Sequence, residues 1–129
     1  MLNFRQFEVG PDPFGAKWQV LFKWLQTAIS LRHSDTVDVQ FLLHSGDAHA
    51  KKQIAMPHAE LLELSRRMGH ELNDAWCARL AAAHLRYMVE SGEDLDKDLV
   101  TVSPGELARY AAAIAQEESA EVAVRRAAN

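Results

Sequence analysis

The chain has 129 residues, of which 48% are hydrophobic and 25% are charged, and its net charge is −4 at pH 7. These values are typical of one globular domain and argue against a disordered or collagen-like chain. No apolar run approaches the roughly 20 residues of a membrane-spanning helix. No cluster of Lys and Arg offers the phosphate contacts from which nucleic-acid binders take much of their affinity. Neither a membrane nor nucleic acid is therefore an expected partner.

The first residues and the cysteine content bear on the cellular compartment. The stretch MLNFRQFEVG lacks the basic start and the continuous apolar core of a signal peptide. Cys77 is the single cysteine, so an internal disulfide cannot form. Both features favour a reducing environment, and we expect the protein to be cytoplasmic.

Alternation of apolar and polar residues predicts an antiparallel meander of three or four strands across residues ~4–56. A short strand at 4–9 precedes a turn at 10–15 that contains two prolines. The next strand carries the densest aromatic stretch of the chain, and one of its faces is strongly apolar. That face is formed by Trp18, Val20, Phe22 and Trp24.

The apolar positions change parity within residues 17–33, because Trp24 is even-numbered whereas Ile29 and Leu31 are odd-numbered. The register must therefore break around Leu25–Ala28. This segment contains no Gly, Pro, Asn or Asp, the residues that tight turns favour. We therefore predict a β-bulge within one long strand rather than a hairpin.

The remaining strands of the meander are simpler. One strand places Asp38 and Gln40 on its outer face, and its inner face consists of Val37, Val39, Phe41 and Leu43. A turn at Ser45–Asp47 leads to a last strand at about Ala50–Met56.

Helical spacing begins near Pro57 and predicts three helices, at about 57–69, 73–91 and 103–118. Pro57 suits the first position of a helix, and Gly69 suits the left-handed position that ends one. Ser103 and Glu106 have the spacing of a capping box, which marks the start of the third helix. Helices that pack against a meander give an α+β fold.

The end of the chain has a different composition. Beyond Gln116 the sequence consists mostly of Ala, Glu and Arg. Such residues bury too little apolar surface to offset the entropy lost on ordering. We therefore predict a single domain at 1–118 and a frayed or disordered tail at 119–129, with the possibility left open that the tail orders on binding.

Histidines near one predicted hairpin suggest a metal site. If the loop is short, His44 and His49 face each other across the two strands with Cβ atoms about 5 Å apart. Two imidazoles could then bind a divalent ion, with Asp47 or His58 as a third ligand. The plainer interpretation is a pair of exposed polar residues at a hairpin end, and we favour it.

His84, Cys77 and the aspartates at 94–98 are weaker candidates for a functional site. His84 and Cys77 lie on one face of the second predicted helix, where a core histidine and a small core thiol are the expected roles. The run at 94–98 has aspartates at the first three alternate positions of a calcium loop. It then has Leu99 where the loop needs glycine and Gly105 where it needs glutamate, so calcium is not expected.

No catalytic motif is present, so we lean against an enzyme and predict no cofactor. The aromatic residues favour instead a non-enzymatic protein-interaction or self-associating module, most simply a homodimer. Trp18, Phe22 and Trp24 are the predicted anchors, and Phe4, Phe7 and Phe14 could extend the surface. A plainer role for each aromatic is burial in the core. The alternative function is binding of a small molecule or divalent metal, by a binding protein or an enzyme, through the histidines near the 44–49 hairpin.

Overall fold

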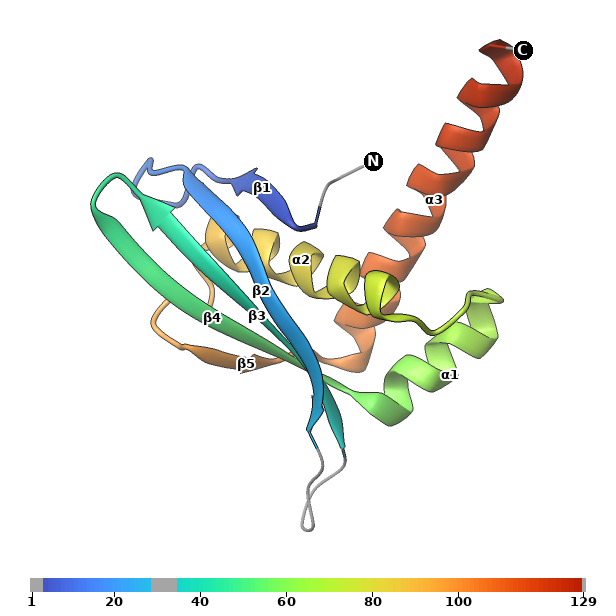
Figure 1. Cartoon of the computed structure of the whole chain (residues 1–129), viewed down its shortest axis with the longest axis horizontal. Helices are drawn as coiled ribbons and strands as arrows, with labels where there is room; N and C mark the ends of the chain where they lie inside the picture. Colours follow the sequence, from blue (N-terminus) through green and yellow to red (C-terminus); the bar gives the residue numbers. More distant parts are fainter. Residues whose placement is uncertain (1–3, 29–34, 129) are drawn as a thin grey trace.

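The computed structural model describes residues 4–28 and 35–128 and has an α+β fold with five strands and three helices (Figure 1). The strands are β1 (Gln6–Val9), β2 (Trp18–Ala28), β3 (Thr36–Ser45), β4 (Ala48–Pro57) and β5 (Leu99–Thr101). The helices are α1 (His58–Met68), α2 (Asp74–Ser91) and α3 (Pro104–Ala128). The predicted fold class is confirmed.

The strands form one sheet in the order β1-β2-β3-β4-β5. The first four strands pair antiparallel, as the meander prediction requires. β5 was not predicted, and it pairs parallel to β4 with Val100 opposite Ile54. The sheet is therefore mixed rather than purely antiparallel. β5 has only three residues, of which Val100 alone is buried, so it gives no alternation that a sequence pattern could detect.

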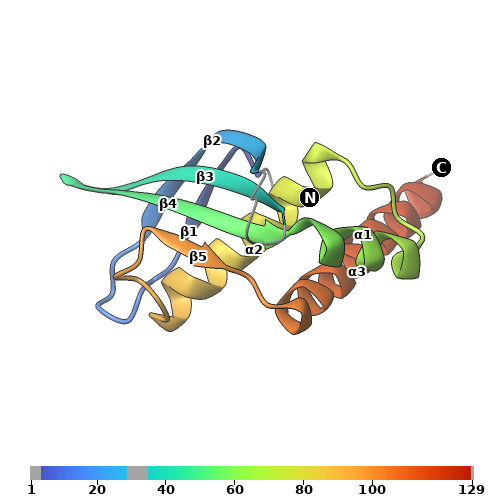
Figure 2. The same ribbon diagram turned by 90° about the horizontal axis from the view of Figure 1, so that it is seen from below.

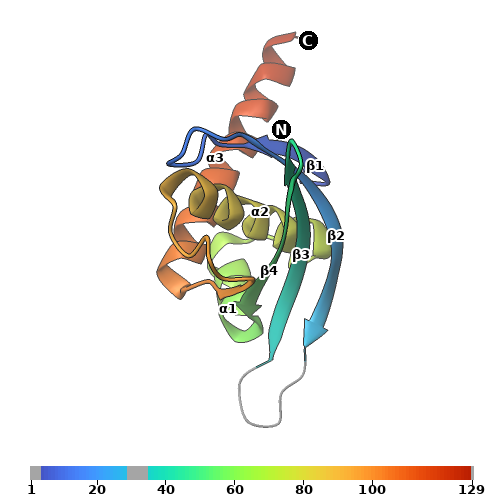
Figure 3. The same ribbon diagram turned by 90° about the vertical axis from the view of Figure 1, so that its left-hand side faces the viewer.

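All three helices cover the same face of the sheet, as Figure 3 shows. The core lies between the two layers, and its largest fully buried side chains include Phe41, Ile54, Leu80, Leu85 and Leu107. The other face of the sheet has no helix against it among the described residues, and we call it the open face. Antiparallel strands tolerate such an arrangement because they alternate apolar and polar side chains between the two faces.

A β-bulge interrupts β2, as predicted, but it lies nearer the start of the strand. Phe22 pairs with Phe41 whereas Trp24 pairs with Gln40, so Lys23 is the extra residue. The bulge exchanges the two faces: Leu25 now lies on the core side with its partner Val39, and Trp24 lies on the open face. The prediction that Trp24 shares a face with Trp18 and Phe22 is therefore wrong. Ile29 and Leu31 lie outside the described residues.

The predicted helix ends are close to those observed. Gly69 and Gly92 adopt the left-handed conformation after α1 and α2, with φ of 63° and 78°. The Asn73 side chain caps α2 by accepting a hydrogen bond from the Trp76 backbone N–H at 2.8 Å. The capping box of α3 forms through reciprocal bonds between Ser103 and Glu106. Pro57 is the last residue of β4 and the N-cap of α1 rather than its first helical residue.

Helix α3 continues to Ala128 instead of ending near Glu118. Its last turns project away from the sheet and the other helices (Figure 1), and their side chains are mostly exposed. Ala, Glu and Arg are strong helix formers, which accounts for the continuation without burial. An exposed helical extension of this kind is marginal in water by itself, so fraying of the tail stays a prediction.

Candidate functional site

The structure does not bring the three predicted anchors together on one surface. Trp18 and Phe22 are partly buried against the core, on the helix side of the sheet. The Phe22 ring makes an edge-to-face contact with Phe41 at a centroid distance of 6.2 Å. Trp24 is partly buried on the open face. Core packing thus accounts for Trp18 and Phe22, and Trp24 is the one that a partner on the open face would meet.

The other predicted aromatics also divide between core and surface. Phe7 is buried, and Phe4 is partly buried with its ring edge-to-face against Phe22 at 5.6 Å. Phe14, in contrast, is 90% exposed in the loop between β1 and β2. Among these three phenylalanines, only Phe14 is available to a ligand or partner.

The predicted cross-strand histidine pair is present at the tip of the β3–β4 hairpin. His44 and His49 are directly opposite in register, and their ring centroids lie 6.2 Å apart. The hairpin tip extends past the helices in Figure 2. Asp47 is in the turn, but His58 begins α1 at the other end of β4. Within the described ranges, no three His, Cys, Asp or Glu residues are grouped to hold a metal ion. The histidine pair therefore lacks an assembled third ligand.

His84 is a hydrogen-bonded core residue, as predicted. Its Nδ1 lies 2.8 Å from the Tyr110 hydroxyl and 3.5 Å from a carboxylate oxygen of Glu106. Burial lowers the pKa of His84, while the charge of Glu106 opposes this shift. The imidazole is thus enclosed between α2 and α3, where burial disfavours its charged form. Its Nε2 atom is buried and has no hydrogen-bond partner among the described residues.

Cys77 is buried on α2, where burial raises the pKa of its thiol to about 11 and the charge of Asp74 adds to the shift. Because the thiolate is the reactive form, we expect a disulfide reagent at pH 8 to modify the folded protein at least roughly 100-fold more slowly than the urea-unfolded protein. Following release of the chromophore with time measures both rates. Similar rates would show that Cys77 is accessible and reactive.

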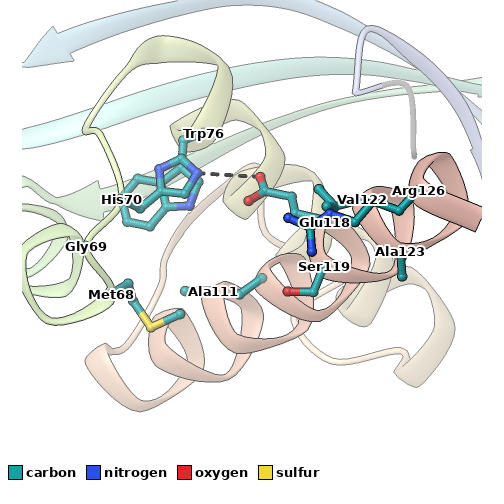
Figure 4. Close-up of a pocket in the computed structure, with 11 residues that line it drawn as sticks. Met68, Gly69, His70, Trp76, Ala111, Glu118, Ser119, Val122, Ala123 and Arg126 are labelled. Atoms are coloured by element: carbon teal, nitrogen blue, oxygen red, sulfur yellow. Dashed lines mark ion pairs between the residues drawn. The ribbon is translucent and has the colours of Figure 1, made fainter. Parts of the chain in front are cut away.

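A groove that the sequence analysis missed lies between the α1–α2 connection and α3 (Figure 4). Its volume is about 510 Å³. One wall is formed by Met68, Gly69, His70 and Trp76, and the α3 wall by Ala111, Ala115, Ser119, Val122 and Ala123, with Glu118 and Arg126 beside them. We call this feature the α3 groove. Its two walls come from segments more than thirty residues apart in sequence, which explains why no motif identified it.

The inner part of the α3 groove is held by side-chain contacts and contains a carboxylate. The His70 ring stacks on Trp76 with centroids 4.9 Å apart and an interplanar angle of 17°. A carboxylate oxygen of Glu118 lies 3.5 Å from His70 Nε2 (Figure 4). The same oxygen accepts a hydrogen bond from Arg79 at 2.8 Å. These contacts fix Glu118 in place, so the groove has an acidic group at a defined position.

The outer part of the α3 groove is apolar and open to solvent. Met68 is 38% exposed on one wall and Val122 is 46% exposed on the other. Arg126 lies one helical turn beyond Val122. The outer part of the groove thus places apolar side chains between Glu118 and Arg126, two groups of opposite charge.

No family model matches the chain, and neither the curated proteins nor the solved structures compared with it give a match. Among the described helices, none is both long enough and apolar enough to cross a membrane.

Proposed function

We propose that the protein is a non-enzymatic interaction module that self-associates, with two copies pairing through the α3 groove. The observation that carries this proposal is the exposed apolar face of α3 between Glu118 and Arg126. Val122 lies at its centre and is 46% exposed, although the same helix buries Leu107 and Ile114 further back. This proposal retains the homodimer expected from the sequence, but the contact residues that we propose differ from the predicted anchors Trp18, Phe22 and Trp24.

The charges along the α3 groove are self-complementary. Glu118 lies four residues before Val122, and Arg126 lies four residues after it. An antiparallel pair of α3 helices that cross at Val122 therefore places Glu118 of each copy beside Arg126 of the other. A two-fold symmetric contact requires such a match, because the same surface must fit itself.

The energetics favour a weak dimer. Stable interfaces usually bury about 800 Å² on each partner, and because this contact consists of one groove and one projecting helix we expect a smaller interface. The gain comes from covering Val122 and Met68 and from supporting helical turns that are marginal when isolated. We expect a dissociation constant on the order of micromolar or weaker.

The test is the solution mass by light scattering after size exclusion, measured over a concentration series with Val122→Asp and Val124→Asp. Val122→Asp places two carboxylates at the symmetry axis and should weaken the dimer at least about 100-fold. Val124→Asp is the matched control, because Val124 is 68% exposed and does not line the groove. A protein that stays monomeric up to about millimolar concentration would contradict self-association.

A charge exchange tests the antiparallel arrangement independently. Arg126→Glu alone and Glu118→Arg alone each bring like charges together, so each variant should be monomeric. An equimolar mixture should restore the dimer, because every contact then pairs a Glu with an Arg. Glu118→Arg also breaks the contacts with Arg79 and His70, so its melting temperature must be checked first.

A dimer that survives Val122→Asp but is lost in Trp24→Asp would place the contact on the open face instead.

A further inference from the structure

A second recess lies near the far end of α2 from the α3 groove. It has a volume of about 270 Å³, opens to solvent and is bordered by two loops, residues 10–17 and 92–98, together with the adjoining ends of the strands. Its apolar lining consists of Phe14, Trp18, Leu43, Ala50, Val89 and Leu95. Two charged residues, Asp12 and Lys52, complete it, and we call it the Lys52 recess.

The first loop is held in shape by Asp12. One carboxylate oxygen accepts hydrogen bonds from the backbone N–H groups of Phe14 and Ala16, both at 2.9 Å, and the other accepts from the Trp18 indole at 3.1 Å. These bonds orient the Trp18 ring and leave Phe14 exposed at the rim. Both oxygens of Asp12 are therefore occupied within the protein.

The two loops contact each other directly. A Cβ atom placed on Gly92 would lie only 2.7 Å from Cγ of Pro13, so a glycine is needed where the loops meet. Gly92 also has a φ of 78°, a conformation that other residues rarely adopt. The walls of the recess are thus set by close packing between segments that are distant in sequence.

Lys52 is the cationic residue of the recess. Its side chain is only 6% exposed on the core side of β4, and its Nζ donates hydrogen bonds to the carbonyl oxygens of Leu95 at 2.7 Å and Lys97 at 2.6 Å. An ammonium has three N–H donors, so one is left beyond these two bonds. The aspartate run predicted as half a calcium loop is therefore organised by this ammonium.

The positive charge of Lys52 is only partly compensated. The carboxylate of Asp98 is 3.9 Å from Nζ, but its side chain is 91% exposed, so water screens its charge. A buried ammonium is costly unless it is paired and fully hydrogen-bonded. Apolar side chains beside the ammonium lower the local dielectric constant, which strengthens its attraction for an anion.

We propose that the Lys52 recess binds a small organic acid with an apolar body and one carboxylate. The body packs between Trp18 and Leu95 under the ring of Phe14, and the carboxylate accepts a hydrogen bond from Lys52. The volume is slightly below the usual range for ligand sites, about 300–1,000 Å³, which limits the ligand to roughly the size of a single ring with a short side chain. This site is separate from the α3 groove, so the two proposals can fail independently.

The probes are 3-phenylpropionate and its neutral amide, titrated into the ¹⁵N-labelled full chain and followed by NMR at the Trp18 indole N–H. We expect saturable shifts for the acid with a dissociation constant on the order of 0.1–1 mM, typical of a ligand of this size. The amide should bind about tenfold more weakly, because it lacks the charge-assisted bond to Lys52. No saturation for the acid, or equal binding of the two probes, would overturn the proposal.

Three variants test whether the probes bind in the Lys52 recess. Ala50→Leu fills the recess while keeping Lys52 and should abolish binding of both probes. Lys52→Met keeps the aliphatic stem and should remove the preference for the acid, whereas Lys51→Met, on the open face of the same strand, should retain it. Lys52→Met could disturb the 92–98 loop. In that case the ratio of acid to amide affinity in the unmodified protein, together with the loss of binding in Ala50→Leu, still tests the proposal. Unchanged binding in Ala50→Leu would place the probe elsewhere and overturn the assignment.

Discussion

Replacing Phe41 by alanine should lower the free energy of unfolding by about 3–5 kcal/mol, the largest single-residue effect that we expect. Phe41 is fully buried at the centre of the sheet, and its ring contacts Phe7 and Phe22 at centroid distances of 6.1 and 6.2 Å. The substitution removes both edge-to-face contacts and leaves a cavity in the core. Since a domain of this size has only about 5–15 kcal/mol of stability, the variant should be close to unfolding.

The matched control is Leu42→Ala, one residue further along β3. Leu42 lies on the open face opposite Lys51 and is only partly buried, so we expect a cost of about 1 kcal/mol or less. Urea unfolding followed by circular dichroism measures both differences. Equal costs at the two positions would mean that the faces of β3 are assigned wrongly, and with them the position of the helix layer.

The second large effect is loss of stability in acid, caused by His84. Burial lowers the pKa of His84 in the folded state below its usual value of 6.5, with Glu106, Glu93 and Asp94 opposing the shift and Arg109 adding to it. As the pH falls through 6.5 the unfolded chain therefore takes up a proton that the folded chain does not. The free energy of unfolding then decreases by up to about 1.4 kcal/mol per pH unit, until the pKa of the folded state is reached.

His84→Gln isolates this contribution, because glutamine does not titrate and can still bond to the Tyr110 hydroxyl. Unfolding should be measured at a series of pH values between about 7 and 5, with the dependence on pH compared between the two proteins. We expect the variant to show a shallower loss of stability in this range. A parallel pH dependence would show that other groups, chiefly carboxylates, cause the loss.

Much of the fold could be predicted from local sequence. Alternation predicted the strands of the antiparallel meander, which the structure has as β1 to β4. Gly69, Asn73 and Ser103 marked helix ends because caps depend on residues only a few positions apart. The bulge in β2 was predicted, but at Leu25–Ala28 rather than between Phe22 and Trp24, where it lies. Parity counting assumed that Trp24 must face the core, whereas a partly buried tryptophan is tolerated on the open face.

The candidate sites could be predicted much less well. Opposition of His44 and His49 followed from hairpin geometry alone, and the structure confirms it. The α3 groove joins residues near Met68 to residues near Val122, and no sequence pattern links them. Lys52 has the appearance of a surface lysine in the sequence, because its burial depends on a loop more than forty positions away.

The sequence by itself therefore determined the α+β class, the succession of strands and helices and most helix ends, since these depend on periodicity and capping within a few residues. Only the tertiary structure decided the face of Trp24, the parallel pairing of β5 and the two concave sites. The physical reason is that pairing register and the enclosure of space are set by contacts between distant segments. The free energy of such contacts depends on how surfaces fit, which residue types alone do not specify.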